Sequence, residues 1–364
     1  MRRSRLLLSA PAPTWLAATA KGLRGAKWVP VVVCCLAVSG FARPKTDVVI
    51  LKNGDHISGE IRRLSRGMLT LKTDSLGTVD IKWQDIVKIS SVFEFKVEDS
   101  AGQRYTGTIA SKEGTPRLEV AGEGLKSEIA QSEVVEIAQA DESPWRRFDG
   151  SFDAGYSFTK SSVRTQFNLD SDLRYHGSQW EAEASYSSIL GSSEGTVDTN
   201  RNVVTLRGDR FLGKKWHAIG AGQYEHNAEL ALDRRVSAGG AAAWRFIQNN
   251  RALASVSGGL TFTREAYTSQ PEGSNLEGLL GAGFQVFKLY SPKLDVTLDY
   301  AFLPNLTTWG RVRSEFDAKA KFEIVKDFYV SLSVYGSFDN QPPSEKSQKQ
   351  DYGIVTSLGW TFRR

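Results

Sequence analysis

The chain has 364 residues, a formal net charge of +5 and two cysteines. Residues 1–42 hold six basic side chains and no acidic one, so the rest of the chain carries 5 − 6 = −1. That balance gives no general basic field for nucleic acid and argues against a nucleic-acid-binding protein. No stretch after residue 42 has eighteen consecutive apolar residues, which excludes a helical membrane protein but not a membrane β-barrel.

The first 42 residues have the order of a secretory signal peptide. Basic residues are followed by an apolar run at 29–38 and by small residues before Ala42. The alternative is a membrane anchor, although the apolar run is short for a spanning helix. Cys34 and Cys35 both lie in this segment, so cleavage after Ala42 would leave an exported chain with no disulfide, thiol nucleophile or thiolate metal site.

Short apolar runs separated by turns predict a small all-β domain over residues 43–140. Asn53-Gly54 between two such runs is a strong hairpin signal. The layout returns 48 positions later, where Gly102 matches Gly54 and Ile109 matches Ile61. We therefore expect two modules, residues 43–90 and 91–140, followed by a linker at 141–150 rich in acids and turn residues.

The first module, with its LKNGDHISGEI run, resembles small bent-sheet barrels of the Sm and SH3-like type. Sm-like modules often bind RNA. Residues 43–145, however, hold 14 Lys and Arg against 17 Asp and Glu, a net charge of −3 that argues against nucleic acid. A contact with a periplasmic protein or with peptidoglycan, or a purely structural role, remains open for residues 43–140.

Residues 312–324 alternate between apolar and charged side chains, broken only by Ser314, which is the pattern of a strand with one apolar face and one solvated face. A soluble antiparallel sheet could produce it too. Eleven other segments of about ten residues read as strands, which fits strands that cross a bilayer around a polar interior. The twelve expected strands are 151–159, 163–174, 179–190, 201–210, 215–226, 236–247, 252–264, 276–287, 293–302, 312–324, 327–338 and 351–362.

The connections predicted between these strands alternate between short and long after the first. Short turns at one end and longer loops at the other are typical of outer-membrane barrels. An even strand count returns the C-terminus to the side of the N-terminal domain, which predicts a periplasmic location for that domain. The expected fold class is therefore all-β. Two small β modules come first in the chain, and an antiparallel transmembrane β-barrel follows over residues 151–364.

The charged residues that alternate with the apolar ones are the candidates for the barrel interior. A self-paired ladder that fills a small barrel and a narrow diffusion pore are both consistent with them. The candidates are Arg313, Glu315, Asp317, Lys319, Lys321, Glu323, Arg207, Asp209 and Glu225.

From Arg207 onward the sequence resembles the salt-induced outer-membrane protein family, a β-barrel domain of unknown function. The resemblance rests on Asp209 with Phe211, on Leu212–Trp216, on Tyr224-Glu225, on Phe302–Leu306 and on the closing Leu358–Phe362, and it covers about residues 145–364. It implies a barrel in the outer membrane and no established activity.

Few residues here suggest chemistry. Of the four histidines, His226 beside Asn227 falls near a predicted outer loop, where an outer-membrane lipid hydrolase would need a His–Ser pair. No phosphate-binding loop, zinc spacing or calcium loop occurs, so we expect no cofactor and no metal.

The sequence thus predicts a non-enzymatic outer-membrane barrel that acts as a narrow solute pore or supports the envelope under osmotic stress. The alternatives are an outer-membrane lipid hydrolase, either a phospholipase or a lipid A deacylase, and a passive anchor for a periplasmic docking module. Its expected partners are outer-membrane lipids and the barrel-assembly machinery.

Overall fold

The computed structural model describes residues 44–122, 124–140, 147–159, 164–177, 179–193, 196–268, 270–288, 293–342 and 348–363. The predicted signal peptide with Cys34 and Cys35, and residues 141–146 of the predicted linker, lie outside the described residues. No helix in the described part of the chain is long and apolar enough to cross a membrane.

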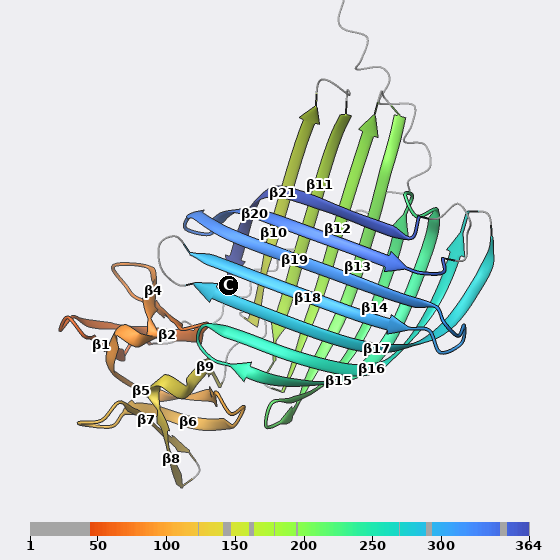
Figure 1. Ribbon diagram of the computed structural model, residues 1–364. Helices are drawn as coiled ribbons and strands as arrows, with labels where there is room; N and C mark the ends of the chain where they lie inside the picture. Colours follow the sequence, from red (N-terminus) through yellow and green to blue (C-terminus); the bar gives the residue numbers. More distant parts are fainter. Residues whose placement is uncertain are drawn as a thin grey trace, which may run out of the picture. The chain divides into compact units, whose positions relative to one another are not determined.

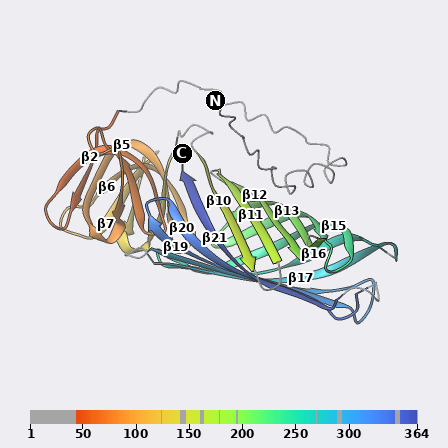
Figure 2. The same cartoon turned by 90° about the horizontal axis from the view of Figure 1, so that it is seen from above.

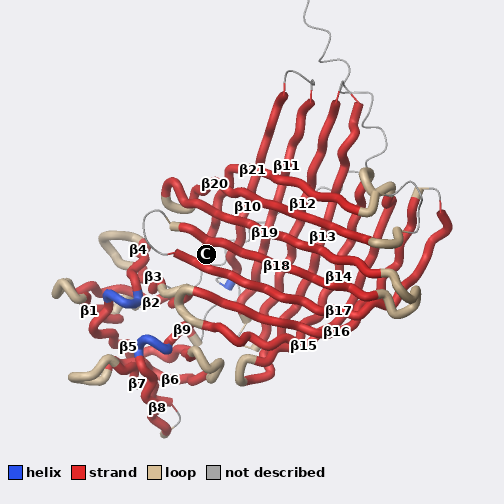
Figure 3. The backbone as a smooth tube through the Cα atoms, viewed as in Figure 1, coloured by secondary structure: helices blue, strands red, loops and turns tan. Residues whose placement is uncertain are grey.

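The N-terminal region forms one nine-stranded antiparallel sheet in the order β4-β3-β2-β1-β5-β6-β7-β8, with β9 paired to β2 and β5. Figure 3 shows two short helical turns among the strands, and these lie at Trp83–Asp85 and Gln131–Glu133. The strands are β1 (Asp47–Leu51), β2 (His56–Ser65), β3 (Met68–Lys72), β4 (Thr78–Lys82), β5 (Ile86–Asp99), β6 (Arg104–Ser111), β7 (Arg117–Gly122), β8 (Leu125–Ala130) and β9 (Val134–Gln139).

The 48-residue repeat is visible in this sheet. Gly54 and Gly102 both turn their hairpins with positive φ, a conformation that glycine adopts without strain. The long strand β5 belongs to both repeats, because its first part pairs with β1 and its second part with β9. At the contact between the repeats, Trp83 Nε1 donates to the Gln131 carbonyl at 2.7 Å.

Both repeats share one hydrophobic core, which contains Ile61 and Leu69 from the first and Ile109 and Ile137 from the second. The end of β2 also pairs with β9, and the start of β5 reaches β6. The two repeats therefore form one sheet around one core. Their likeness to Sm or SH3-like barrels stays a prediction.

The C-terminal region is a closed antiparallel barrel in which every strand pairs with the next and β21 pairs with β10. The prediction of an all-β chain with a twelve-stranded barrel is confirmed. The strands are β10 (Phe148–Thr159), β11 (Arg164–His176), β12 (Trp180–Ser193), β13 (Thr196–Gly213), β14 (Trp216–Asn227), β15 (Leu232–Gln248), β16 (Ala252–Tyr267), β17 (Gln270–Lys288), β18 (Leu294–Pro304), β19 (Val312–Val325), β20 (Phe328–Asp339) and β21 (Gln350–Arg363).

Several strands are longer than predicted. β13 starts at Thr196 rather than 201, and β17 starts at Gln270 rather than 276, because polar residues continue the hydrogen-bonded ladder beyond the apolar band. Only residues 194–195 and 268–269 then separate the strands where long loops were expected. The predicted contrast between short and long connections is correspondingly weaker.

The barrel has two facing walls. In Figure 1, β10–β13 run steeply behind β17–β20, and Figure 2 shows the same crossing from above. We call the end at which β10 begins and β21 finishes the proximal end, and the opposite end the distal end.

Side chains alternate between the two sides of the barrel wall. Phe152, Val236, Trp244 and Phe246, all predicted for the apolar face, point outward and are 41–48% exposed. Large apolar side chains of other barrel strands, among them Leu260, Leu280 and Phe322, are similarly exposed. The residues between them point into the barrel and are mostly polar.

Candidate functional site: the charged barrel interior

All nine residues predicted for the interior lie on the inward face of their strands. On β19, Arg313, Glu315, Asp317, Lys319, Lys321 and Glu323 stand opposite Asp339, Ser337, Tyr335, Ser333, Ser331 and Tyr329 of β20. Arg207 stands opposite Glu183 of β12, and Asp209 opposite Glu181. Glu225 stands opposite Arg235 of β15.

Three arginines and five carboxylates form a buried network at the distal end, here called the distal ion network. Arg235 contacts Glu225 and Glu265, each at 2.8 Å. Arg311 contacts Glu265 at 2.9 Å and Asp339 at 2.6 Å. Arg313 contacts Glu277 at 2.8 Å and Glu315 at 3.3 Å. The three guanidinium side chains are 3–4% exposed, and each contacts two carboxylates, with Glu265 shared by Arg235 and Arg311.

Two further contacts join strands that are not neighbours in the barrel. Asn227 Nδ2 of β14 donates to Asp351 Oδ2 of β21 at 2.8 Å. The Arg201 guanidinium of β13 lies 4.6 Å from the centre of the Tyr335 ring of β20, within the range of a cation–π interaction. Such contacts have to cross the interior. Together with the distal ion network they bring side chains of non-neighbouring strands into contact across the distal part of the interior.

A second buried cluster, the proximal cluster, is centred on Asp153 of β10, which is fully buried. Its carboxylate accepts hydrogen bonds from Lys319 Nζ at 3.0 Å, from Tyr329 Oη at 2.9 Å and from Ser331 Oγ at 2.9 Å. Lys321 Nζ donates to Ser151 Oγ at 3.0 Å. The predicted residues Lys319 and Lys321 are thus engaged with β10.

Other charged side chains of the interior are less buried than those of the two clusters. Asp299 of β18 stands directly opposite Asp317 of β19, and both side chains are exposed. Arg207 pairs with Asp209 at 3.0 Å on its own strand, and Arg174 pairs with Glu183 at 2.9 Å. The middle of the interior therefore holds charged groups in contact with solvent.

Glycines of β21 make room for two inward tyrosines of β20. Tyr329 stands opposite Gly359, and Tyr335 opposite Gly353. A Cβ atom on Gly359 would lie 2.4 Å from the Tyr329 ring, and one on Gly353 would lie 2.6 Å from the Tyr335 ring. The absence of a side chain thus lets Tyr329 reach Asp153 and Tyr335 reach Arg201.

In the described part of the chain, His226 and His176 have partners other than serine. His226 Nδ1 lies 2.8 Å from the backbone oxygen of Asp233, and His226 points to the opposite side of β14 from the inward Glu225. His176 lies between Asp149 at 2.8 Å and Glu181 at 3.2 Å, so both of its ring nitrogens face carboxylates. The described residues contain no group of three or more His, Cys, Asp or Glu placed to hold a metal ion.

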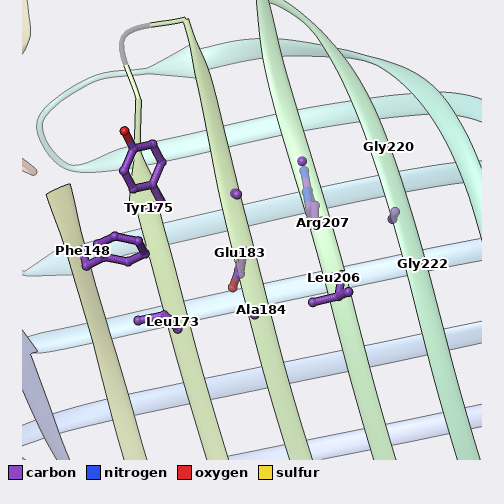
Figure 4. Close-up of a pocket in the computed structure, with 12 residues that line it drawn as sticks. Phe148, Leu173, Tyr175, Glu183, Ala184, Leu206, Arg207, Gly220 and Gly222 are labelled. Atoms are coloured by element: carbon purple, nitrogen blue, oxygen red, sulfur yellow. The ribbon is translucent and has the colours of Figure 1, made fainter. Parts of the chain in front are cut away.

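A hollow of about 420 Å³ lies on the outer side of the wall over β10–β14, away from the charged clusters. Figure 4 shows Phe148, Leu173, Tyr175 and Leu206 around it. Gly208 and Gly220 create the space, since a Cβ at either position would meet nothing within 4 Å. Its lining is mainly apolar and brings no reactive pair together.

The sequence did not identify most of the residues that form ion pairs with the predicted interior residues. Asp153, Glu265 and Glu277 lie on other strands, and Arg311 was assigned to a loop although its side chain is buried. Alternation within each strand could have indicated the first three as inward residues. It could not indicate which strands they would meet across the interior.

Residues 152–362, more than half of the chain, match the profile of a family described as "Protein of unknown function, DUF481". No curated protein matches the sequence.

Among solved structures, a NanC porin is 8% identical with a TM-score of 0.36, over 60% of this chain and all of that one. A bacterial polysaccharide outer-membrane secretin is 5% identical with a TM-score of 0.33, over 60% of this chain and 97% of that one. OmpT of Vibrio cholerae is 9% identical with a TM-score of 0.29, over 80% of this chain and all of that one. Likenesses this distant carry no argument about function.

Proposed function

The chain belongs to the family described as "Protein of unknown function, DUF481", and we propose that it is an outer-membrane β-barrel protein whose distal end is closed by its own side chains. The observation that carries this proposal is the reversed polarity of the barrel. Large apolar side chains cover its outside, whereas ion-paired charges occupy its inside. The barrel also pairs most of its backbone groups between strands, as hydrocarbon demands.

In this proposal the proximal end faces the periplasm, because both ends of the barrel sequence lie there. The protein is not an enzyme, and it supports the integrity of the envelope rather than admitting bulk solutes. The wall-to-wall contacts and the distal ion network support closure. A role under osmotic stress rests only on the resemblance to the salt-induced family.

Planar-bilayer conductance of the folded protein tests this function. We expect the protein to insert without discrete conductance steps. The double substitution Arg235→Ala with Arg311→Ala leaves Glu265 without both of its cations. Because uncompensated buried charge draws in water, we expect this variant to conduct.

The matched control is Arg234→Ala with Arg264→Ala. These two arginines share Glu272 and are 56% and 60% exposed, so the control removes the same charge outside the interior. It should remain silent. Regular conductance steps from the unmodified protein would contradict a closed barrel and favour a narrow pore.

A further inference from the structure

The seam between the first and last barrel strands is hydrogen-bonded along only part of its length. β10 and β21 form six pairs, from Asp149 opposite Arg363 to Ala154 opposite Leu358. The other barrel seams have nine or more pairs. Among the described residues, 155–159 of β10 pair only with β11, and 350–357 of β21 pair only with β20. In Figure 1 the distal half of β10 runs on beyond β21.

The two strands separate gradually. A Cβ on Gly155 would lie 2.6 Å from the Thr356 carbonyl oxygen, so the strands still approach at that point. Beyond it each strand presents a free edge of N–H and C=O groups. Such an edge is costly in hydrocarbon unless polar groups satisfy it. The distal half of this seam therefore suits an occupant that brings hydrogen-bonding groups.

Apolar side chains flank the outer side of this seam. Tyr156 of β10 is 70% exposed, and Tyr352, Ile354 and Leu358 of β21 are 68–79% exposed. Outward apolar side chains that have a strand on both sides are less exposed, such as Phe316 at 38% and Leu206 at 59%. Tyr156, Tyr352 and Ile354 lie beyond the last pair of the seam and Leu358 lies at that pair, so all four apolar groups are available to an alkyl chain.

The inner side of the unpaired seam is uncharged where it begins, and farther toward the distal end it carries Asp351 of β21, which is hydrogen-bonded to Asn227. Gly155, Asn168, Val355 and Ser357 lie inward next to it. In the direction of the proximal cluster lie Lys319, whose side chain is 23% exposed, and the partly exposed carboxylates Asp170 and Asp172 of β11, whereas Asp153 itself is buried and already accepts three hydrogen bonds. A head group that carries both a positive and a negative charge would meet partners of each sign there.

We propose that the distal half of the β10–β21 seam is a lateral binding site for a single-chain amphiphile with a zwitterionic head group. The head group lies between the two strand edges and toward the proximal cluster, and the alkyl chain stays in the membrane against Tyr156, Ile354 and Leu358. Because side chains meet across the distal part of the interior, this seam is the way in from the surrounding membrane. The proposal rests on the proposed membrane location of the barrel.

Photo-crosslinking in phospholipid vesicles tests the site. The probe is lysophosphatidylethanolamine with a diazirine on its alkyl chain next to the head group, and labelled peptides are mapped by mass spectrometry. We expect severalfold more label on residues 155–159 and 350–357 than on β18. A blocking variant carries Ile354→Cys, with Cys34 and Cys35 replaced by serine so that only position 354 reacts. A bulky maleimide attached there should reduce the seam label to the β18 level.

The matched control is the same maleimide on Leu298→Cys, an outward position of β18 away from the seam. It should leave the seam label unchanged. Equal label on the seam and on β18, or a seam label that survives the block at Ile354→Cys, would overturn the proposal. Label on β18 and β19 without enrichment at the seam refutes this site alone. No label on any outward strand face refutes the membrane location as well.

Discussion

At the scale of single residues, the interior depends on glycines that no alternation rule requires. Gly359 lies beneath Tyr329, whose hydroxyl donates to the fully buried Asp153. The ring cannot hold this position if a methyl group occupies the same space. One glycine thus determines the geometry of a hydrogen bond on another strand.

We expect Gly359→Ala to destabilise the barrel by about 1–3 kcal/mol, the usual cost of overpacking a filled interior. The added Cβ would lie 2.4 Å from the Tyr329 ring and would push it away from Asp153. Urea unfolding of the folded barrel measures the change. Gly336→Ala is the control, because a Cβ there meets nothing within 4 Å. Equal effects of the two substitutions would contradict the proposed role of Gly359.

Glu265 is the residue on which the distal ion network converges. It contacts both Arg235 and Arg311 and is 2% exposed. Glu265→Gln removes the charge that both guanidinium groups face, and breaking a buried pair costs about 3–5 kcal/mol. Each arginine keeps one other carboxylate, Glu225 or Asp339, so we expect the lower end of that range in urea unfolding.

Glu272→Gln supplies the comparison, since it makes the same chemical change. Glu272 contacts Arg234 and Arg264, whose side chains are more than half exposed. Exposed pairs contribute less than about 1 kcal/mol, so this variant should unfold almost like the unmodified protein. If Glu272→Gln cost as much as Glu265→Gln, burial would not be the reason for the effect.

At the scale of elements, the N-terminal repeats depend on each other. β5 supplies strands to both repeats, and β9 closes against β2 of the first repeat. Residues 43–90 alone would lack β9 and half of the shared core. We expect this fragment to be unfolded by circular dichroism, whereas residues 43–140 should give a β spectrum and one cooperative thermal transition. A folded 43–90 fragment would show that the modules are independent.

Strand positions were predictable because alternation is a local property. Residues 312–324 were expected as a strand, and β19 spans Val312–Val325. The ends of β13 and β17 were missed because Thr196–Asn200 and Gln270–Asn275 are mainly polar and lack the apolar alternation of the rest of these strands. Their pairing depends on the neighbouring strand, which no local pattern reports. Loop lengths were overestimated for the same reason.

At the scale of the whole molecule, the sequence revealed which side chains face inward but not what they meet. Lys319 could be assigned to the inner face from β19 alone. Its carboxylate, Asp153, is 166 residues away, and the pair forms only because the barrel closes β21 onto β10. The incomplete seam was equally hidden, since β10 and β21 both alternate normally. Contacts of this kind follow from closure and register rather than from composition.

Lipid contact along β20 tests the central claim of a membrane barrel most directly. Fluorophores would be attached to single cysteines at Leu332 and Val334, which face outward, and at Ser333 and Ser337, which face inward. The replacement of Cys34 and Cys35 by serine leaves one thiol in each variant. With brominated lipids in the vesicles, we expect strong quenching at 332 and 334 and weak quenching at 333 and 337. Uniform quenching, or stronger quenching at the two serine positions, would show that β20 does not face lipid in a membrane barrel.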